Sequence, residues 1–404
     1  MQRIVLKFGG TSVGNIEKIK KVANIIKKKR DKGNEVIVVV SAMSGVTNDL
    51  KKKSELISKN FDQKELDVLL SAGEQISSSL LAGALINEGL KARSWLGWQI
   101  PIVTNDNHTS SHITNIRTDE VLKFISEGGV AVVAGFQGLT KKDRITTLGR
   151  GGSDLSAVVI AKFFKTDYCE IYTDVEGVLT TDPSINKKAK KIEKISYEEM
   201  LEMASLGAKV MQPNSVQASM IYDIPIHVRS TFSENQGTKI ISENEIDYKK
   251  VVTGIAYSKN DAKVTLVGVI DKPGVAADIF EPLGSNNINV DMVIQNTSSD
   301  GKKTDVTFTI KREDLERTLK LIEKKNKNLN YSKITHDNKV SKVSIIGAGM
   351  ITNPGVTHKM FRSLANNKIN ILAISTSEIK ISILVHEDYT QQAVKILHKT
   401  FELD

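Results

Sequence analysis

Residues 3–14, RIVLKFGGTSVG, join a short apolar run to a turn that contains two glycines. The β-branched run predicts a buried strand over residues 3–8. The apolar spacing in IEKIKKVANIIKKKRDKG then predicts a helix that ends at Gly33. A second apolar run, EVIVVVS, follows at residues 35–41. This strand, helix and strand order is typical of a mostly parallel sheet covered by helices on both faces.

The same alternation continues through the first 245 residues. Buried strands are predicted at 130–135 (VAVVAG) and 168–173 (YCEIYT), and helices at 65–88, 117–127, 153–164 and 196–206. One α/β domain over residues 1–245 accounts for these elements. The polar stretch ISENEIDYKK near residue 245 reads as a linker.

Beyond the linker the chain repeats itself. KVTLVGV at residues 263–269 matches KVSIIGA at 342–348, and the tripeptide PGV recurs after each. The first copy, residues 263–337, has the predicted order βαββαβ, whereas the second, residues 342–404, lacks one strand. We therefore expect the run VVTGIAYS, within the 246–262 segment, to close the sheet of the second copy. Alternatively this run is a lone linker strand, which would leave an apolar edge prone to aggregation.

Composition excludes several classes of protein. The chain has 404 residues, 40% of them hydrophobic and 25% charged, and no apolar run long enough to suggest membrane insertion. It has one cysteine, Cys169, and begins without a charged and then apolar leader, so we expect a cytoplasmic protein. The net charge of +9 comes without a nucleic-acid-binding motif, and we expect no nucleic-acid partner.

The first turn has the composition of a phosphate-binding loop. Gly9 and Gly10 let backbone amides approach an anion closely, and Lys7 adds a positive charge beside them. The spacing matches neither a Walker A loop nor a dinucleotide-binding fingerprint. A tight strand-to-helix turn without a ligand would explain the glycines equally well.

Three further loops point to an anionic substrate. They are SAMSGVTN at 41–48, TLGRGGSD at 147–154 and YTDVEGVLTTDP at 172–183. Arg150 offers a planar fork for a carboxylate, and Asp154 fits either a helix cap or a catalytic role. Loops that follow strands of an open α/β sheet meet at one edge, where such sheets bind ligands. No residue spacing predicts a protein metal site, and any metal is expected to be Mg²⁺ held mainly by phosphates.

These loops resemble those of the aspartate kinase family. The motifs KFGGTSVG, SAMSGVTN, LLSAGEQ, TLGRGGSD, YTDVEGV with TTDP, and GAKVMQP occur in the family's order and at comparable spacing. The resemblance covers essentially the whole chain. It implies an amino acid kinase fold followed by two ferredoxin-like ACT domains. It also implies transfer of the ATP γ-phosphoryl group to the side-chain carboxylate of L-aspartate, the first step toward lysine, diaminopimelate, threonine and methionine.

The resemblance assigns roles to residues of this chain. The implied catalytic residues are Lys7, Asp154 and Lys209. The implied substrate-binding residues are Thr47, Glu74, Arg150, Gly151, Gly152 and Ser153, with Glu74 on the α-ammonium group and Arg150 on a carboxylate. ATP, with Mg²⁺, is implied to contact Lys7, Phe8, Gly9, Gly10, Ser41, Thr173, Asp174, Leu179, Thr180, Thr181, Asp182, Pro183, Ser184 and Lys209.

The ACT pair implies feedback inhibition by lysine, threonine or both. The expected effector residues are Asp271, Pro273, Gly274, Val275, Ala276, Asn289, Asp291 and Gln295 in the first repeat, and Thr357, Asn370, Ile371 and Thr376 in the second. ACT domains commonly pair between subunits, so we expect a homodimer through them or a hetero-oligomer with a shorter ACT-only subunit.

Some residues depart from the family pattern. Leu179 stands where an aromatic residue is common, Ser184 where arginine is common, and Gln212-Pro213-Asn214 where a His-Pro-Arg type sequence is common. These departures concern adenine stacking and phosphate contacts. Two other functions fit parts of the sequence: a kinase of the same fold acting on glutamate, carbamate or a nucleotide, and a catalytically silent amino-acid sensor.

Overall fold

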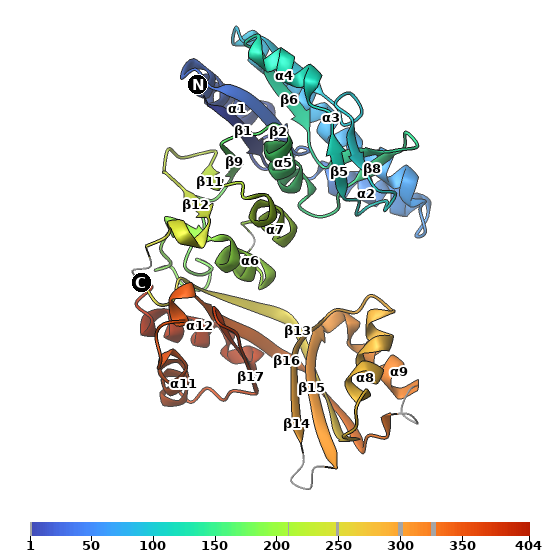
Figure 1. Ribbon diagram of the computed structural model, residues 1–404, viewed down its shortest axis with the longest axis vertical. Helices are drawn as coiled ribbons and strands as arrows, with labels where there is room; N and C mark the ends of the chain where they lie inside the picture. Colours follow the sequence, from blue (N-terminus) through green and yellow to red (C-terminus); the bar gives the residue numbers. More distant parts are fainter. Residues whose placement is uncertain (1, 209, 248–249, 298–301, 325–328) are drawn as a thin grey trace. The chain divides into compact units, whose positions relative to one another are not determined.

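The computed structural model describes residues 2–208, 210–247, 250–297, 302–324 and 329–404. The chain forms two compact units, which Figure 1 shows in blue to yellow and in yellow to red. The first contains most of the chain up to Asp247, and the second the chain beyond it. Two short segments that precede the expected boundary, Leu179–Lys190 and Leu206–Ala208, belong to the second unit.

An eight-stranded sheet forms the centre of the first unit, in the order β10-β12-β11-β9-β1-β2-β6-β3. Neighbouring strands are parallel except β11 and β12. Because β9, β1 and β2 are adjacent and parallel, the loops that follow them lie at the same edge. The strands are β1 (Arg3–Phe8), β2 (Glu35–Val40), β3 (Ala92–Trp95), β6 (Val130–Ala134), β9 (Tyr168–Thr173), β10 (Lys194–Ser196), β11 (Ile226–Ser230) and β12 (Thr238–Ile241).

Helices cover both faces of this sheet. Apolar residues of α1 and α3 share one core with alternate residues of β1 and β2, and α4 and α5 contact the sheet separately from that core. Seven helices are described in this unit: α1 (Ile16–Asp31), α2 (Val46–Ile57), α3 (Gln63–Asn87), α4 (Asp119–Ser126), α5 (Gly152–Phe163), α6 (Tyr197–Ser205) and α7 (Pro213–Tyr222).

The sequence predicted neither α2 nor α7. In α2 only Ser54 is buried, while Leu56 and Ile57 are exposed, so the helix has no apolar stripe to detect. In α7 serines occupy buried positions, which removes the same signal.

A four-stranded sheet, in the order β5-β4-β7-β8, completes the unit. Its strands are β4 (Ile102–Thr104), β5 (Ile113–Ile116), β7 (Gln137–Thr140) and β8 (Ile145–Thr147). The loop between β4 and β5 and the end of β8 lie side by side, since Ser111 donates its backbone N–H to the carbonyl of Thr147 at 2.9 Å. This sheet therefore supplies two neighbouring backbone segments, both close to α3.

Helix α3 is the one helix in the described ranges that is long and apolar enough to cross a membrane by length and composition. Half of its most apolar window is buried inside the unit. It also buries Asp67 and Glu74, so it has the character of a core helix.

A six-stranded antiparallel sheet spans both repeats in the second unit, in the order β14-β15-β13-β16-β18-β17. Its strands are β13 (Gly254–Ile270), β14 (Val290–Thr297), β15 (Lys303–Lys311), β16 (Lys333–Ile346), β17 (Ala373–Thr376) and β18 (Lys380–His386). Helices α8 (Val275–Gly284) and α9 (Leu315–Lys324) cover the first repeat, and α11 (Val356–Asn366) and α12 (Thr390–Thr400) the second. Within the described residues, the one-turn helices are η1 (Glu243–Glu245), η2 (Arg312–Asp314), η3 (Ala348–Met350) and η4 (Glu387–Tyr389).

The long strands β13 and β16 each run through both repeats (Figure 1). Ile255 lies opposite Ile345, so the start of β13 pairs with the second repeat, as the missing strand there requires. Val264 lies opposite His336, so the rest of β13 pairs within the first repeat. The two ACT-like halves therefore share one continuous sheet.

Candidate active site

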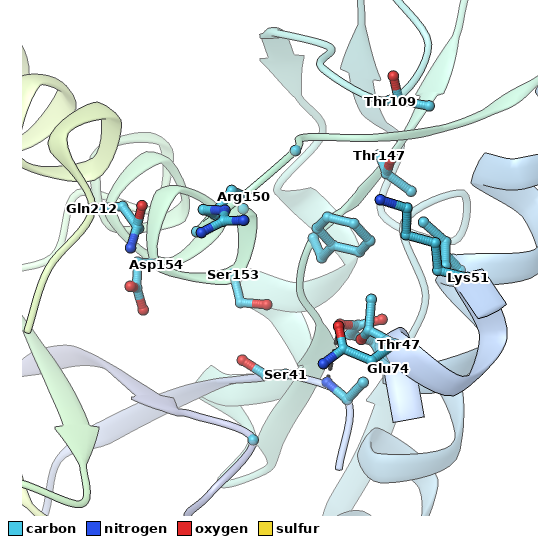
Figure 2. Close-up of a pocket in the computed structure, with 18 of the residues that line it drawn as sticks. Ser41, Thr47, Lys51, Glu74, Thr109, Thr147, Arg150, Ser153, Asp154 and Gln212 are labelled. Atoms are coloured by element: carbon cyan, nitrogen blue, oxygen red, sulfur yellow. Dashed lines mark hydrogen bonds between the residues drawn. The ribbon is translucent and has the colours of Figure 1, made fainter. Parts of the chain in front are cut away.

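A cavity of about 930 Å³ opens in the first unit (Figure 2). The ends of β1 and β2, helices α2 and α3, and the loop before α5 contribute to its lining. It gathers residues from three of the four loops selected from the sequence. The predicted site residues that line it are Lys7, Gly10, Ser41, Thr47, Glu74, Arg150, Gly151, Gly152, Ser153 and Asp154.

Lys7 and Asp154 form an ion pair in this cavity, between Nζ and Oδ1. Both residues are largely buried, at 8% and 9% exposure. Lys7 belongs to β1, and Asp154 to the first turn of α5, where Gly151 occupies the cap position. Asp154 is thus not the cap of this helix. The Asp154 carboxylate holds the Lys7 ammonium near the carboxyl end of β1.

Two glycines allow the loops to meet here. A Cβ atom on Gly10 would lie 2.7 Å from the carbonyl oxygen of Ala42, so only glycine permits this approach of the first loop to the second. Gly151 has a φ of 73°, in the left-handed region, and a Cβ atom on it would clash with Cγ of Gln212. Gly151 thereby turns the chain into α5 directly after Arg150.

Glu74 is a buried carboxylate on α3, with 3% exposure. Its Oε1 accepts a hydrogen bond from the backbone N–H of Ala42 at 3.0 Å, and its Oε2 has no hydrogen-bond partner in the described part of the chain. Burial raises the pKa of Glu74 to about 7. Figure 2 shows Glu74 beside Thr47. An unpartnered carboxylate oxygen in a cavity suits a cationic ligand group.

Arg150 extends from the loop between β8 and α5, on the side of the cavity opposite Thr47 (Figure 2). It is exposed, and no ion pair to its guanidinium occurs among the residues that the structure describes. Its backbone carbonyl accepts a hydrogen bond from Asn214 Nδ2 at 3.3 Å. A cationic fork and a buried carboxylate thus face one cavity, which suits a ligand that carries both a carboxylate and an ammonium group.

The structure places several predicted nucleotide-binding residues outside this lining. The Phe8 ring is buried and stacks on Tyr172 with centroids 4.7 Å apart, so its side chain belongs to the core. Thr173 is the last residue of β9 and Asp174 follows it, near Gly9, whose N–H donates to the carbonyl of Tyr172.

The remaining nucleotide-binding predictions fall elsewhere. Leu179, Thr180, Thr181, Asp182, Pro183 and Ser184 all belong to the second unit. Lys209 lies outside the described residues.

Sequence reasoning missed other residues that line the cavity: Lys51, Thr109, Phe136 and Thr147. Gln212, a departure from the family pattern, also lines it. Lys51 follows Thr47 by four residues on α2, and this spacing puts both side chains on one helix face. This spacing becomes a signal only once α2 is known to be a helix. Thr147 begins the motif TLGRGGSD, in which the expected site residues start at Arg150.

The expected effector residues lie in the second unit, around the openings of α8 and β14 and near α11 and β17. Gly274, with a φ of 94°, caps α8, and Val275 and Ala276 follow it. Asp291 on β14 pairs with the largely buried Lys342 of β16. Asn370 and Ile371 precede β17, which begins at Ala373.

The chain is similar to known proteins both in amino-acid sequence and in fold. Residues 2–230 match the model of the amino acid kinase family, and residues 264–325 and 343–401 match an ACT domain model. An aspartate kinase of Stutzerimonas stutzeri is 46% identical over all of this chain and 98% of its own length. Aspartokinase 2 of Bacillus subtilis is 44% identical over the same shares of the two chains. The crystal structure of E. coli aspartokinase III with aspartate and ADP is 26% identical, has a TM-score of 0.81 and covers 99% of both chains.

Proposed function

Because this chain belongs to the amino acid kinase family, and within it to the aspartate kinases, we propose that the cavity beside Lys7 is where the ATP γ-phosphoryl group is transferred to the β-carboxylate of L-aspartate. The observation that carries this assignment is the set of Lys7, Glu74 and Arg150 around one cavity. The product is 4-phospho-L-aspartate. The ACT domains make the enzyme a feedback-regulated one.

Aspartate is proposed to lie between Glu74 and Arg150. The unpartnered Oε2 of Glu74 accepts from the α-ammonium group, and the Arg150 fork binds the α-carboxylate. Thr47 and Ser153 supply hydroxyls on either side of the cavity (Figure 2). This leaves the β-carboxylate free to approach the phosphoryl group.

Lys7 is proposed to neutralise the transferring phosphoryl group. Phosphoryl transfer spreads negative charge over the equatorial oxygens, so a fixed cation acts mainly on the transition state. Asp154 holds the Lys7 ammonium in place before ATP binds. Ser41, at the end of β2, lies at the same side of the cavity as Asp154 in Figure 2 and is proposed to donate to a phosphate oxygen.

ATP is proposed to bind as its Mg²⁺ complex. The cavity offers the oxygens of Ser41 and Asp154 beside Lys7, and Mg²⁺ is commonly held by one or two such protein oxygens together with substrate phosphates. When bound, the ion would supply further neutralisation of the phosphate charge. The other nucleotide contacts, proposed from the resemblance, are Thr173, Asp174 and residues 179–184, with Lys209 on the phosphates.

The decisive experiment is coupled detection of ADP from the purified full-length chain with ATP and one acceptor at a time. Turnover with aspartate and none with glutamate is expected. Turnover with glutamate, carbamate or a nucleotide would assign another acceptor, and no turnover with any acceptor would favour an amino-acid sensor.

A further inference from the structure

Asp67 on α3 is a completely buried carboxylate outside the cavity lining. Both of its oxygens lie 3.1 Å from the backbone N of Thr109, which donates to them. Thr147 Oγ1 donates to Oδ1 at 2.5 Å, and His108 Nδ1 lies 2.7 Å from Oδ2. An ionised carboxylate only accepts hydrogen bonds, so this His108 nitrogen is the donor. One carboxylate thus ties α3 to two separate loops.

These loops form one rim of the cavity. Thr109 and Thr147 both line it, and Arg150 follows Thr147 by three residues. The loops also contact each other directly, because Ser111 donates to the Thr147 carbonyl from its N–H at 2.9 Å and its Oγ at 3.0 Å. A Cβ atom on Gly149 would lie 3.1 Å from the carbonyl oxygen of Thr109. A shift of either loop therefore moves the backbone that carries Arg150.

We propose that Asp67 is a positioning residue for the amino-acid substrate, holding residues 108–109 and 147–150 at the distance from α3 that Arg150 requires. The inference rests on the proposed function. Helix α3 carries both Asp67 and Glu74, separated by seven residues, or about two turns. The helix therefore fixes the spacing between the ammonium-binding carboxylate and the loop of the carboxylate-binding arginine. None of the residues in this network is among those proposed to contact ATP.

Asp67→Asn is the most direct test, because asparagine has the same shape but places an NH₂ donor against other donors. We expect the KM for aspartate to rise about tenfold or more, with the KM for ATP within about twofold of the wild type. A control variant is Asp62→Ala. Asp62 caps the same helix by accepting from the N–H groups of Lys64 and Glu65, but does not contact the rim. It should destabilise α3 and leave the aspartate KM unchanged.

His108 gives a second test if Asp67→Asn does not fold. His108→Ala removes a donor to Asp67, whereas His108→Asn can restore one near the position of Nδ1. We expect the alanine variant to raise the aspartate KM and the asparagine variant to recover most of the loss. In the double variant Asp67→Asn/His108→Ala, the two effects should be less than additive, since both act through one network.

Two results would overturn the inference: an aspartate KM in Asp67→Asn equal to that of Asp62→Ala, or equal increases in both KM values. Neither result would affect the proposed function, which fails only if the wild-type chain does not phosphorylate aspartate.

Discussion

Nε2 of His398 lies 2.8 Å from Oγ1 of Thr180 in the second unit. His398 is fully buried on α12, and its Nδ1 lies 2.7 Å from Oδ1 of Asp404. Thr180 Oγ1 also accepts from the backbone N–H of Lys190 at 3.0 Å. Residues 179–184, a segment proposed to bind nucleotide, are thus hydrogen-bonded to helix α12 of the second ACT repeat.

Thr180→Val should lower the free energy of unfolding by about 1–2 kcal/mol, because it leaves His398 Nε2 buried without a partner. Thr181 provides the matched control. Its hydroxyl is buried and unpartnered in the described chain, so Thr181→Val should cost nothing or stabilise slightly. Urea unfolding of the three proteins compares them directly. Equal stabilities would mean that the Thr180 to His398 bond contributes nothing measurable.

Lys7→Ala should lower kcat by about 10²-fold or more, with little change in the aspartate KM. The reason is that a cation on the transferring group stabilises mostly the transition state. The variant also leaves Asp154 buried without its partner, which disfavours a nearby phosphate. Steady-state ADP release measures both parameters. Turnover within about threefold of the wild type would contradict the assigned role.

The raised pKa of Glu74 predicts a pH dependence. Only the ionised carboxylate attracts the α-ammonium group, so kcat/KM for aspartate should fall as the pH drops below about 7. Glu74→Gln should remove this decrease of kcat/KM at low pH, and the variant should be poorly active at every pH.

Stability gives an independent readout of Glu74. The native carboxyl keeps its proton up to a higher pH than the unfolded one, so the wild type loses stability as the pH rises from about 4.5 to about 7. Glu74→Gln should remove this part of the decline. Profiles of the two proteins that superimpose, in activity and in stability, would place the titration elsewhere.

Arg150→Lys should raise the aspartate KM about tenfold and leave the ATP KM nearly unchanged, because a single ammonium cannot reproduce a planar fork on a carboxylate. Arg144→Lys is a suitable control. Arg144 pairs with Glu65 at 2.7 Å in an exposed salt bridge and does not line the cavity. Comparable changes in both substrate constants would instead give Arg150 a structural or nucleotide-binding role.

The sequence predicted the elements with a strong apolar period and the loops between them. The αβ alternation and the paired repeats follow from local patterns, whereas the place of Glu74 in one site with Lys7 and Arg150 was implied by the resemblance to aspartate kinases. Asp67 could not be found in this way, because its partners His108 and Thr147 lie 41 and 80 residues further along the chain. The place of residues 179–190 in the second unit likewise depends on long-range contacts, such as that with His398.

Feedback inhibition by lysine, with threonine or the two together as alternatives, is the expected behaviour of the ACT pair. The amides that open α8 after Gly274 are suited to an α-carboxylate, and Asp291 on the adjacent β14 offers a carboxylate to an ammonium group. Lys342 already pairs with Asp291, so an amino-acid ammonium would have to displace it.

The prediction of feedback inhibition is tested by adding L-lysine, L-threonine or their mixture while aspartate-dependent ADP release is measured. D-lysine is the control for ionic strength and charge. Asp291→Ala should raise the concentration of lysine needed for inhibition. It should leave kcat without effector unchanged, because Asp291 belongs to the second unit and does not line the cavity.

Linkage also requires that aspartate weaken lysine binding by the same factor by which lysine weakens aspartate binding. Sedimentation with and without effector would show whether inhibition is tied to a dimer formed through the ACT domains. If no end product derived from aspartate inhibits at millimolar concentration, the effector residues proposed around α8, β14, α11 and β17 are wrong.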